Sequence, residues 1–255
     1  MPNNHETGVD IPQSAVKRLT NIFFLVDTSG SMDEQGKIDA VNNAMHEAIP
    51  TVREFAAKEA SHKIQCSILE FNSDVNWITE QPVDAEDLQW IDLKAGGGTC
   101  LGAAYTQLAS KLSRREGGVM AQHLNNAPII ILLTDGYPTD DSSTGLSLLK
   151  KNRWFMAAVR IAIEITGGDV DRKQLLDFTG TNELVIPVAS DRLQKELKNI
   201  VVKSMTNSTS AEDVVNALTG GEQKNKPAEQ SAQVQESTEK PTPTSGSIDL
   251  DDFDF

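Results

Sequence analysis

Cysteine and histidine are scarce in this sequence, which narrows the metal sites and covalent links that it can form. Only two cysteines, Cys66 and Cys100, occur among 255 residues. Cys66 falls in an expected strand, so we predict a buried thiol rather than a disulfide, as suits a reducing compartment. The histidines have neither the spacing of a zinc site nor that of a catalytic triad, and we expect them at the surface: His5, His46, His62 and His123.

Positive charge is also in short supply. The chain has 23 lysines and arginines against 37 acidic residues, and its net charge is −14. Because phosphate contacts need clustered basic residues, a nucleic-acid partner is excluded. No apolar run approaches the length of a membrane span, so membrane insertion is not expected. The first residues lack a basic region followed by an apolar core, which argues against a signal peptide and favours a cytoplasmic location.

Aromatic and large apolar residues are nearly absent from 206–247, which reads as a flexible polar linker apart from one weak helix expected at 211–218. The last eight residues, 248–255, alternate apolar and acidic side chains. Three interpretations stay open: a solvated acidic end, a short docking motif for a protein partner, or an acid that occupies a metal site as a pseudo-ligand. The residues of the docking motif would be Ile248, Leu250, Asp251, Asp252, Phe253 and Phe255.

The most informative stretch is 21–31. Ile22 to Val26 form an uninterrupted apolar run that stops at Asp27 and is followed by Ser29 and Ser31. Such a run between turn residues is typical of a strand buried on both faces. Asp27 would end this strand, and the two serines would lie in the loop beyond it. Open α/β sheets bind their ligands at this edge, so we predict a metal site there.

Strand-like and helix-like segments alternate along the rest of the chain. The sequence predicts strands at about 21–27, 63–71, 75–79, 128–134, 155–165 and 183–188. It predicts helices at about 38–56, 101–112, 142–153, 171–179 and 190–205, the first kinked at Pro50. This alternation indicates an α/β fold with a mostly parallel sheet covered on both faces. The short turn 72–74 makes strand 75–79 an antiparallel neighbour at the sheet edge.

Two further segments can complete the metal site. Asp135 ends a second buried strand, and Thr99 follows three glycines that permit close approach of the backbone. Together Asp27, Ser29, Ser31, Thr99 and Asp135 offer only hard oxygen donors, which favour Mg²⁺, or Mn²⁺ or Ca²⁺, over zinc. Two carboxylates only balance a dication, so the metal can accept a carboxylate from outside. The glycines lack the Gly-Lys-Ser/Thr ending of a phosphate-binding loop, which argues against a nucleotide site.

These three segments resemble the metal-ion-dependent adhesion site of von Willebrand factor A domains. The resemblance rests on Asp27-Thr-Ser-Gly-Ser31, Thr99 and Thr134-Asp135-Gly136, and covers about 20–205, after a lead-in of 1–19. It implies a doubly wound sheet of six strands in the order 3-2-1-4-5-6 with one antiparallel edge strand. It also implies direct metal contacts from Ser29, Ser31 and Thr99, with Asp27 and Asp135 direct or linked through water.

Within that superfamily the chain is most similar to bacterial TerY-like proteins of tellurite-resistance and stress systems. The similarity lies in LVDTSGSM at 25–32, GGGTCLGAA at 96–104 and LLTDGYPTD at 132–140. It implies two protein partners, a metal-dependent protein phosphatase and a Ser/Thr-type kinase. The charged segment 114–127 and the long tail lie outside the pattern of that group.

Two functions compete for the metal site. One is a non-enzymatic binding module that captures an acidic residue of a protein partner. The alternative is a Mg-dependent phosphohydrolase, because enzymes of the haloacid-dehalogenase type also place an aspartate after a buried strand. Those enzymes need a second acid two residues later, and here that position is Ser29. The sequence therefore favours the binding module.

Overall fold

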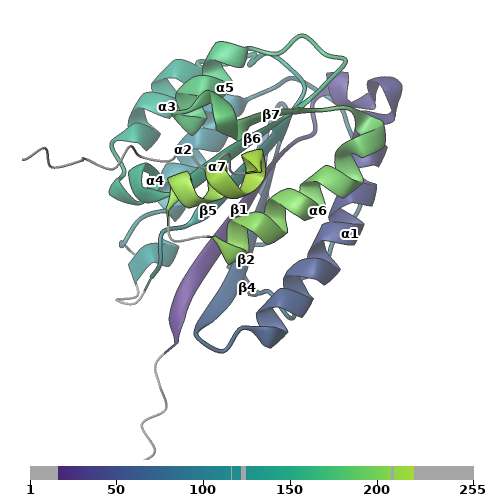
Figure 1. The fold of residues 1–255 in the computed structure, drawn as a ribbon. Helices are drawn as coiled ribbons and strands as arrows, with labels where there is room; N and C mark the ends of the chain where they lie inside the picture. The colour runs from purple at the N-terminus through teal and green to yellow at the C-terminus, as the bar shows by residue number, and fades with distance from the viewer. Residues whose placement is uncertain (1–16, 116, 122–124, 208–209, 221–255) are drawn as a thin grey trace, which may run out of the picture. The chain divides into compact units, whose positions relative to one another are not determined.

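A seven-stranded sheet forms the centre of the computed structural model, which describes residues 17–115, 117–121, 125–207 and 210–220 (Figure 1). Its strands are β1 (Arg18–Asp27), β2 (His62–Phe71), β3 (Val75–Trp77), β4 (Val83–Asp84), β5 (Ile129–Thr134), β6 (Val159–Ile165) and β7 (Val185–Val188). The order is β3-β2-β1-β5-β6-β7, with β4 paired to β2. All pairs are parallel except those that β3 and β4 make with β2.

This topology confirms the predicted α/β class and the predicted order of six strands. The seventh strand, β4, was not predicted. It has two residues, and it exists through pairing with β2, where Gln65 lies opposite Asp84 and Cys66 opposite Val83. Two residues are too few for an alternation pattern to be visible in the sequence.

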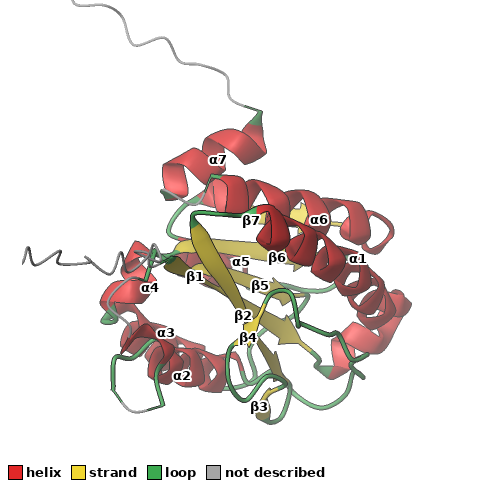
Figure 2. Cartoon of the chain, turned by 90° about the horizontal axis from the view of Figure 1, so that it is seen from below, coloured by secondary structure: helices red, strands yellow, loops and turns green. Residues whose placement is uncertain are grey.

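Helices cover both faces of the sheet (Figure 2). The α-helices are α1 (Lys37–Lys58), α2 (Leu101–Lys111), α3 (Ser142–Lys150), α4 (Arg153–Ala157), α5 (Arg172–Thr179), α6 (Ser190–Thr206) and α7 (Ala211–Thr219). Short 3₁₀ turns are η1 (Gly30–Gly36), η2 (Val119–Ala121) and η3 (Asn182–Leu184). None of these helices combines the length and the apolar character needed to cross a membrane.

The central strand β1 contributes to two hydrophobic cores. Phe24 and Val26 belong to the core under α1 and α6, whereas Phe23 and Leu25 belong to the core under α2, α3 and α5. All four side chains are fully buried. The uninterrupted apolar run of β1 is therefore explained by burial on both faces, as predicted.

Two local features differ from the prediction. Pro50 does not split α1, which runs without a break from Lys37 to Lys58. Pro50 is exposed, so water can satisfy the carbonyl that its missing N–H leaves free. The predicted strand 155–165 begins only at Val159, because the Asn152 side chain accepts hydrogen bonds from two backbone amides and starts α4 before it.

The C-terminal part of the described chain carries one more helix. The helix expected at 211–218 is present as α7, which contacts α6 and buries Val214 completely. The lead-in up to residue 16, the linker beyond 220 and the docking motif with Ile248, Phe253 and Phe255 lie outside the described residues. The proposed domain limits therefore stay a prediction.

Candidate metal centre

Both predicted carboxylates lie at the same edge of the sheet. Asp27 is the last residue of β1, and Asp135 directly follows β5. The two strands are parallel neighbours, with Val26 opposite Leu133, so their carboxyl ends coincide. Neither aspartate has any exposed surface. Two buried carboxylates at one point call for positive charge nearby.

Hydrogen bonds fix both oxygens of Asp27. Its Oδ1 accepts from the backbone N–H of Ser29 at 2.8 Å, and its Oδ2 accepts from the Thr134 hydroxyl at 2.5 Å. Burial raises the pKa of Asp27 to about 6, although these hydrogen bonds lower it and the nearby Asp135 raises it further. The carboxylate form is thus disfavoured by its surroundings alone, and a bound cation would relieve that penalty.

The two serine hydroxyls point to the same place as the acids. Ser29 Oγ and Ser31 Oγ are 3.1 Å apart, and Ser31 Oγ donates to Asp135 Oδ1 at 2.7 Å. Ser29 is almost fully buried and has an extended backbone just before η1. Ser31 Oγ therefore contacts Asp135 directly, and Ser29 Oγ lies beside Ser31 Oγ.

Thr99 is brought to this place by backbone bonds between two loops. Gly96 N–H donates to Thr28 O at 2.8 Å, and Gly30 N–H donates to Gly97 O at 3.0 Å. A side chain on Gly30 would begin 3.3 Å from Gly97 O, closer than most such contacts. The glycine run thus allows the loop with Thr99 to lie directly against the loop that follows β1.

The hydroxyls of Ser31 and Thr99 both lie near Gly136. A Cβ atom built there would lie 3.3 Å from Ser31 Oγ and 3.9 Å from Thr99 Oγ1. Both hydroxyls therefore lie close to the residue that directly follows Asp135. All five residues predicted to bind the metal are brought together; their roles as ligands stay a prediction.

The loop after β5 is joined to the start of α2. Thr139 Oγ1 accepts from Thr99 N–H at 2.8 Å, and Thr139 N–H donates to Thr99 O at 2.9 Å. Asp140 accepts from the backbone N–H groups of Gly102 and Ala103 at 2.9 and 2.8 Å. Asp140 thus caps α2, whereas Asp141 caps α3 through Thr144 N–H. Each carboxylate therefore accepts hydrogen bonds from the first backbone N–H groups of a helix.

Lys37 is a member of the centre that the sequence did not reveal. Its Nζ lies 2.6 Å from Asp135 Oδ2 and 3.3 Å from Ser31 O, and the side chain is fully buried. Lys37 is the first residue of α1. Nothing in its sequence neighbourhood separates it from the exposed lysines that begin many amphipathic helices.

The donor set fits a hard divalent cation. In the described ranges no group of three His, Cys, Asp or Glu side chains is placed to hold a metal, so a metal here depends on hydroxyl oxygens. Two carboxylates and three hydroxyls, with water, provide the oxygen ligands that Mg²⁺, Mn²⁺ and Ca²⁺ accept.

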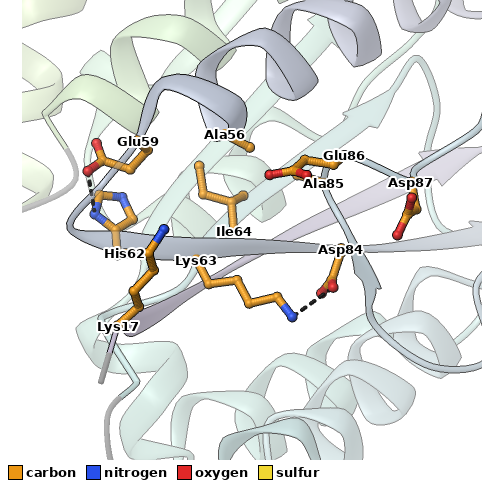
Figure 3. A pocket seen from close by; sticks show the side chains of 10 residues that line it. All are labelled: Lys17, Ala56, Glu59, His62, Lys63, Ile64, Asp84, Ala85, Glu86 and Asp87. Carbon is orange, nitrogen blue, oxygen red and sulfur yellow. Dashed lines mark ion pairs between the residues drawn. The ribbon is translucent and has the colours of Figure 1, made fainter. Parts of the chain in front are cut away.

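A separate hollow of about 220 Å³ lies at the other end of β2 (Figure 3). Four of its ionisable side chains are already paired with one another, since Lys63 Nζ lies 2.7 Å from Asp84 and His62 lies 3.7 Å from Glu59. We therefore assign no ligand to it.

Comparison with known protein families identifies the family of this chain. The profile of the von Willebrand factor type A domain matches residues 21–202. No curated protein matches significantly. A von Willebrand factor type A protein from Catenulispora acidiphila shares 18% identity and a TM-score of 0.52, over 74% of this chain and 43% of the other. The pilus adhesin SpaC from Lactobacillus rhamnosus GG shares 15% identity and a TM-score of 0.56, over 81% and 32%.

A third structure adds information on metals in this fold. Proximal thread matrix protein 1 from the mussel byssus, with a zinc-occupied metal-ion-dependent adhesion site, shares 21% identity and a TM-score of 0.51, over 72% of this chain and 45% of that one. The chain thus spans less than half the length of these three solved proteins. At such identities the similarity establishes the fold.

Proposed function

The chain belongs to the von Willebrand factor type A domain family, and from this premise we propose that it is a metal-dependent interaction module that binds a carboxylate of a protein partner. The convergence of two buried carboxylates and three hydroxyls at the carboxyl ends of β1 and β5 carries this proposal. The similar pilus adhesin and matrix protein agree with a role in interaction rather than catalysis.

Asp27, Ser29, Ser31, Thr99 and Asp135 would hold the cation. Three of the five ligands are neutral, so a bound dication would remain an acceptor for an anionic oxygen from outside. We propose Mg²⁺ as the resident metal, because every donor is a hard oxygen and no thiolate or imidazole is among them. Mn²⁺ and Ca²⁺ are the alternatives.

The surface around the centre indicates how the partner carboxylate is presented. Tyr137, two residues after Asp135, is 51% exposed and offers an aromatic contact. The loops 28–36, 135–141 and 166–171 contain no lysine or arginine, and exposed acids stand on them: Asp33, Glu34, Asp141 and Asp169. Lys94 is an exposed base near the loop of Thr99. A carboxylate flanked by basic residues would match this surface best.

Several finer proposals rest on the sequence motifs. We propose that the module acts in the cytoplasm of a bacterium, in a stress or tellurite-resistance system, with a metal-dependent phosphatase and a Ser/Thr-type kinase as its partners. The two free cysteines agree with a reducing compartment. The C-terminal residues Ile248, Leu250, Asp251, Asp252, Phe253 and Phe255 would form a second docking motif.

The experiment compares partner binding with and without metal. Isothermal titration of the full chain with the proposed partners, a metal-dependent protein phosphatase and a Ser/Thr-type kinase, would be run in Mg²⁺ and in EDTA. We expect EDTA and the double variant Ser29→Ala/Ser31→Ala each to weaken binding at least about tenfold. Circular dichroism checks that the variant folds. Binding that is indifferent to both treatments would refute the metal-dependent module.

The phosphohydrolase alternative has its own test. Ser29 stands where such an enzyme needs an acid, and its backbone N–H holds Asp27 Oδ1 at 2.8 Å. We therefore propose that the protein is not an enzyme. Purified protein would be assayed on a panel of phosphate esters in Mg²⁺. Turnover that Asp27→Asn abolishes would reverse this proposal.

A further inference from the structure

We propose that Lys37 makes metal binding and carboxylate binding depend on each other. This inference rests on the proposed function, since it assumes a metal that accepts a partner carboxylate. The carboxylates of Asp27 and Asp135 and the ammonium of Lys37 together give the metal-free centre a net charge of −1. A dication would then raise it to +1, and one incoming carboxylate would neutralise it.

The contacts of Asp135 carry this inference. Asp135 Oδ2 accepts from Lys37 Nζ at 2.6 Å, and Oδ1 accepts from Ser31 Oγ at 2.7 Å. The ion pair has no exposed surface on either side chain. A metal that uses Asp135 must therefore share its carboxylate with a positive charge that is itself buried. Repulsion between the two cations lowers the affinity of the centre for metal alone.

Lys37 has little freedom to leave when a metal binds. Gln35 and Gly36, the two residues before Lys37, both have a positive φ, in the left-handed region of backbone conformation. The loop after β6 covers the pair: a Cβ on Gly167 would lie 3.6 Å from Lys37 Cε, and one on Gly168 would lie 2.0 Å from Asp135 O. The ammonium is thus held beside Asp135 by the surrounding backbone.

Two consequences follow from a fixed internal cation. Without metal, Lys37 already neutralises Asp135, so the fold does not need a metal to balance this carboxylate. With metal, the excess positive charge is relieved only by an anion. A carboxylate ligand must then raise the affinity for metal, and the metal must raise the affinity for the carboxylate by the same factor.

The test measures metal affinity rather than any activity. Isothermal titration of the full chain with Mn²⁺ would be run in acetate and in chloride at equal ionic strength, corrected for Mn²⁺ bound by acetate. Wild type would be compared with Lys37→Met and with Lys58→Met, an exposed lysine at the far end of the same helix. We expect Lys37→Met to bind Mn²⁺ at least about tenfold more tightly in chloride, and to gain less affinity from acetate than wild type does. Lys58→Met should behave as wild type.

The outcomes separate this inference from the proposed function. Equal Mn²⁺ affinity in wild type and Lys37→Met would overturn the role of Lys37 and leave the metal centre intact. Absence of Mn²⁺ binding in all three proteins and both salts would overturn the metal centre itself, and the inference with it. If Lys37→Met does not fold, Lys37→Gln, which removes the charge but keeps a hydrogen-bond donor for Asp135, takes its place with the same expected results.

Discussion

Thr134 donates its hydroxyl hydrogen to Asp27 Oδ2 at 2.5 Å, across 107 positions of sequence. The bond joins the last residues of β1 and β5 and fixes the orientation of the Asp27 carboxylate. Burial nevertheless dominates, and it raises the pKa of Asp27 from 3.8 to about 6. The metal-free protein therefore holds this carboxylate at a free-energy penalty near neutral pH.

The first prediction concerns Asp27→Asn in EDTA. A carboxyl group whose pKa is higher in the folded state stabilises the fold below its unfolded value of 3.8, and this contribution is lost as the pH rises through about 6. We expect Asp27→Asn to exceed wild type in free energy of unfolding by about 1–3 kcal/mol at pH 7.5, and by much less at pH 4.5. Urea unfolding at both pH values measures this. A difference that does not change with pH would contradict the burial of the charge.

The second prediction concerns Asp140, which joins the loop after β5 to α2. Asp140→Ala removes the hydrogen bonds that Gly102 and Ala103 donate, and should lower the free energy of unfolding by about 1 kcal/mol. Because the same loop holds Thr99 through Thr139, affinity for Mg²⁺ or Mn²⁺ should fall as well.

Asp141→Ala provides the matched control for this change. It removes the corresponding cap from α3, and Asp141 is exposed and bonded within its own helix turn. Calorimetric metal titration of both variants should show weaker binding only for Asp140→Ala. Equal metal affinity in the two variants would mean that the cap of α2 does not position Thr99.

The third prediction concerns Gly168. A Cβ atom added to this glycine would lie 2.0 Å from the backbone oxygen of Asp135. Gly168→Ala forces backbone to move against backbone, so we expect a loss of about 1–3 kcal/mol in the free energy of unfolding and weaker metal binding. Gly96→Ala serves as control, because nothing lies within 4 Å of its Cβ position. Thermal unfolding and metal titration compare the two. Equal tolerance of both substitutions would contradict the close packing of the 166–168 loop on Asp135.

The fourth prediction concerns the two thiols. Cys66 is fully buried, and burial raises its pKa to about 12, whereas Cys100 is partly exposed. Ellman's reagent should therefore modify Cys100 alone in the native protein and both thiols in urea. Cys100→Ser, which removes the accessible thiol, should abolish the native reaction. Two rapidly reacting thiols in the folded protein would refute the burial of Cys66.

The sequence was sufficient for the parts of the centre that follow recognisable strands. Asp27 and Asp135 each follow an apolar run. Ser29 and Ser31 stand on either side of Gly30, and Thr99 follows three glycines. These are local signals, and the parallel sheet then brings the ends together. The alternation of strands and helices predicted a mostly parallel sheet, whereas the strand order was predicted from the resemblance to von Willebrand factor A domains.

Lys37 and β4 could not be predicted for a common reason. The role of Lys37 depends on Asp135, which is 98 residues away, and on the loop at Gly167 that covers it. The strand β4 exists only through its partner β2. The exposure of Pro50 likewise depends on how α1 lies on the sheet, and α1 is not split there. Tertiary contacts decide all three features.

The central place of β1 has a consequence for biosynthesis. β1 is made first but lies between β2 and β5, and its pairing with β5 spans 107 residues, from Ile22 to Ile129. Contacts of such long sequence separation slow folding, and a nascent chain holding only β1, α1 and β2 exposes one apolar edge of β1. The ribosome must therefore release β5 before Asp27 meets Asp135. Translational pausing or chaperone capture before Asp135 is released would delay assembly of the metal centre.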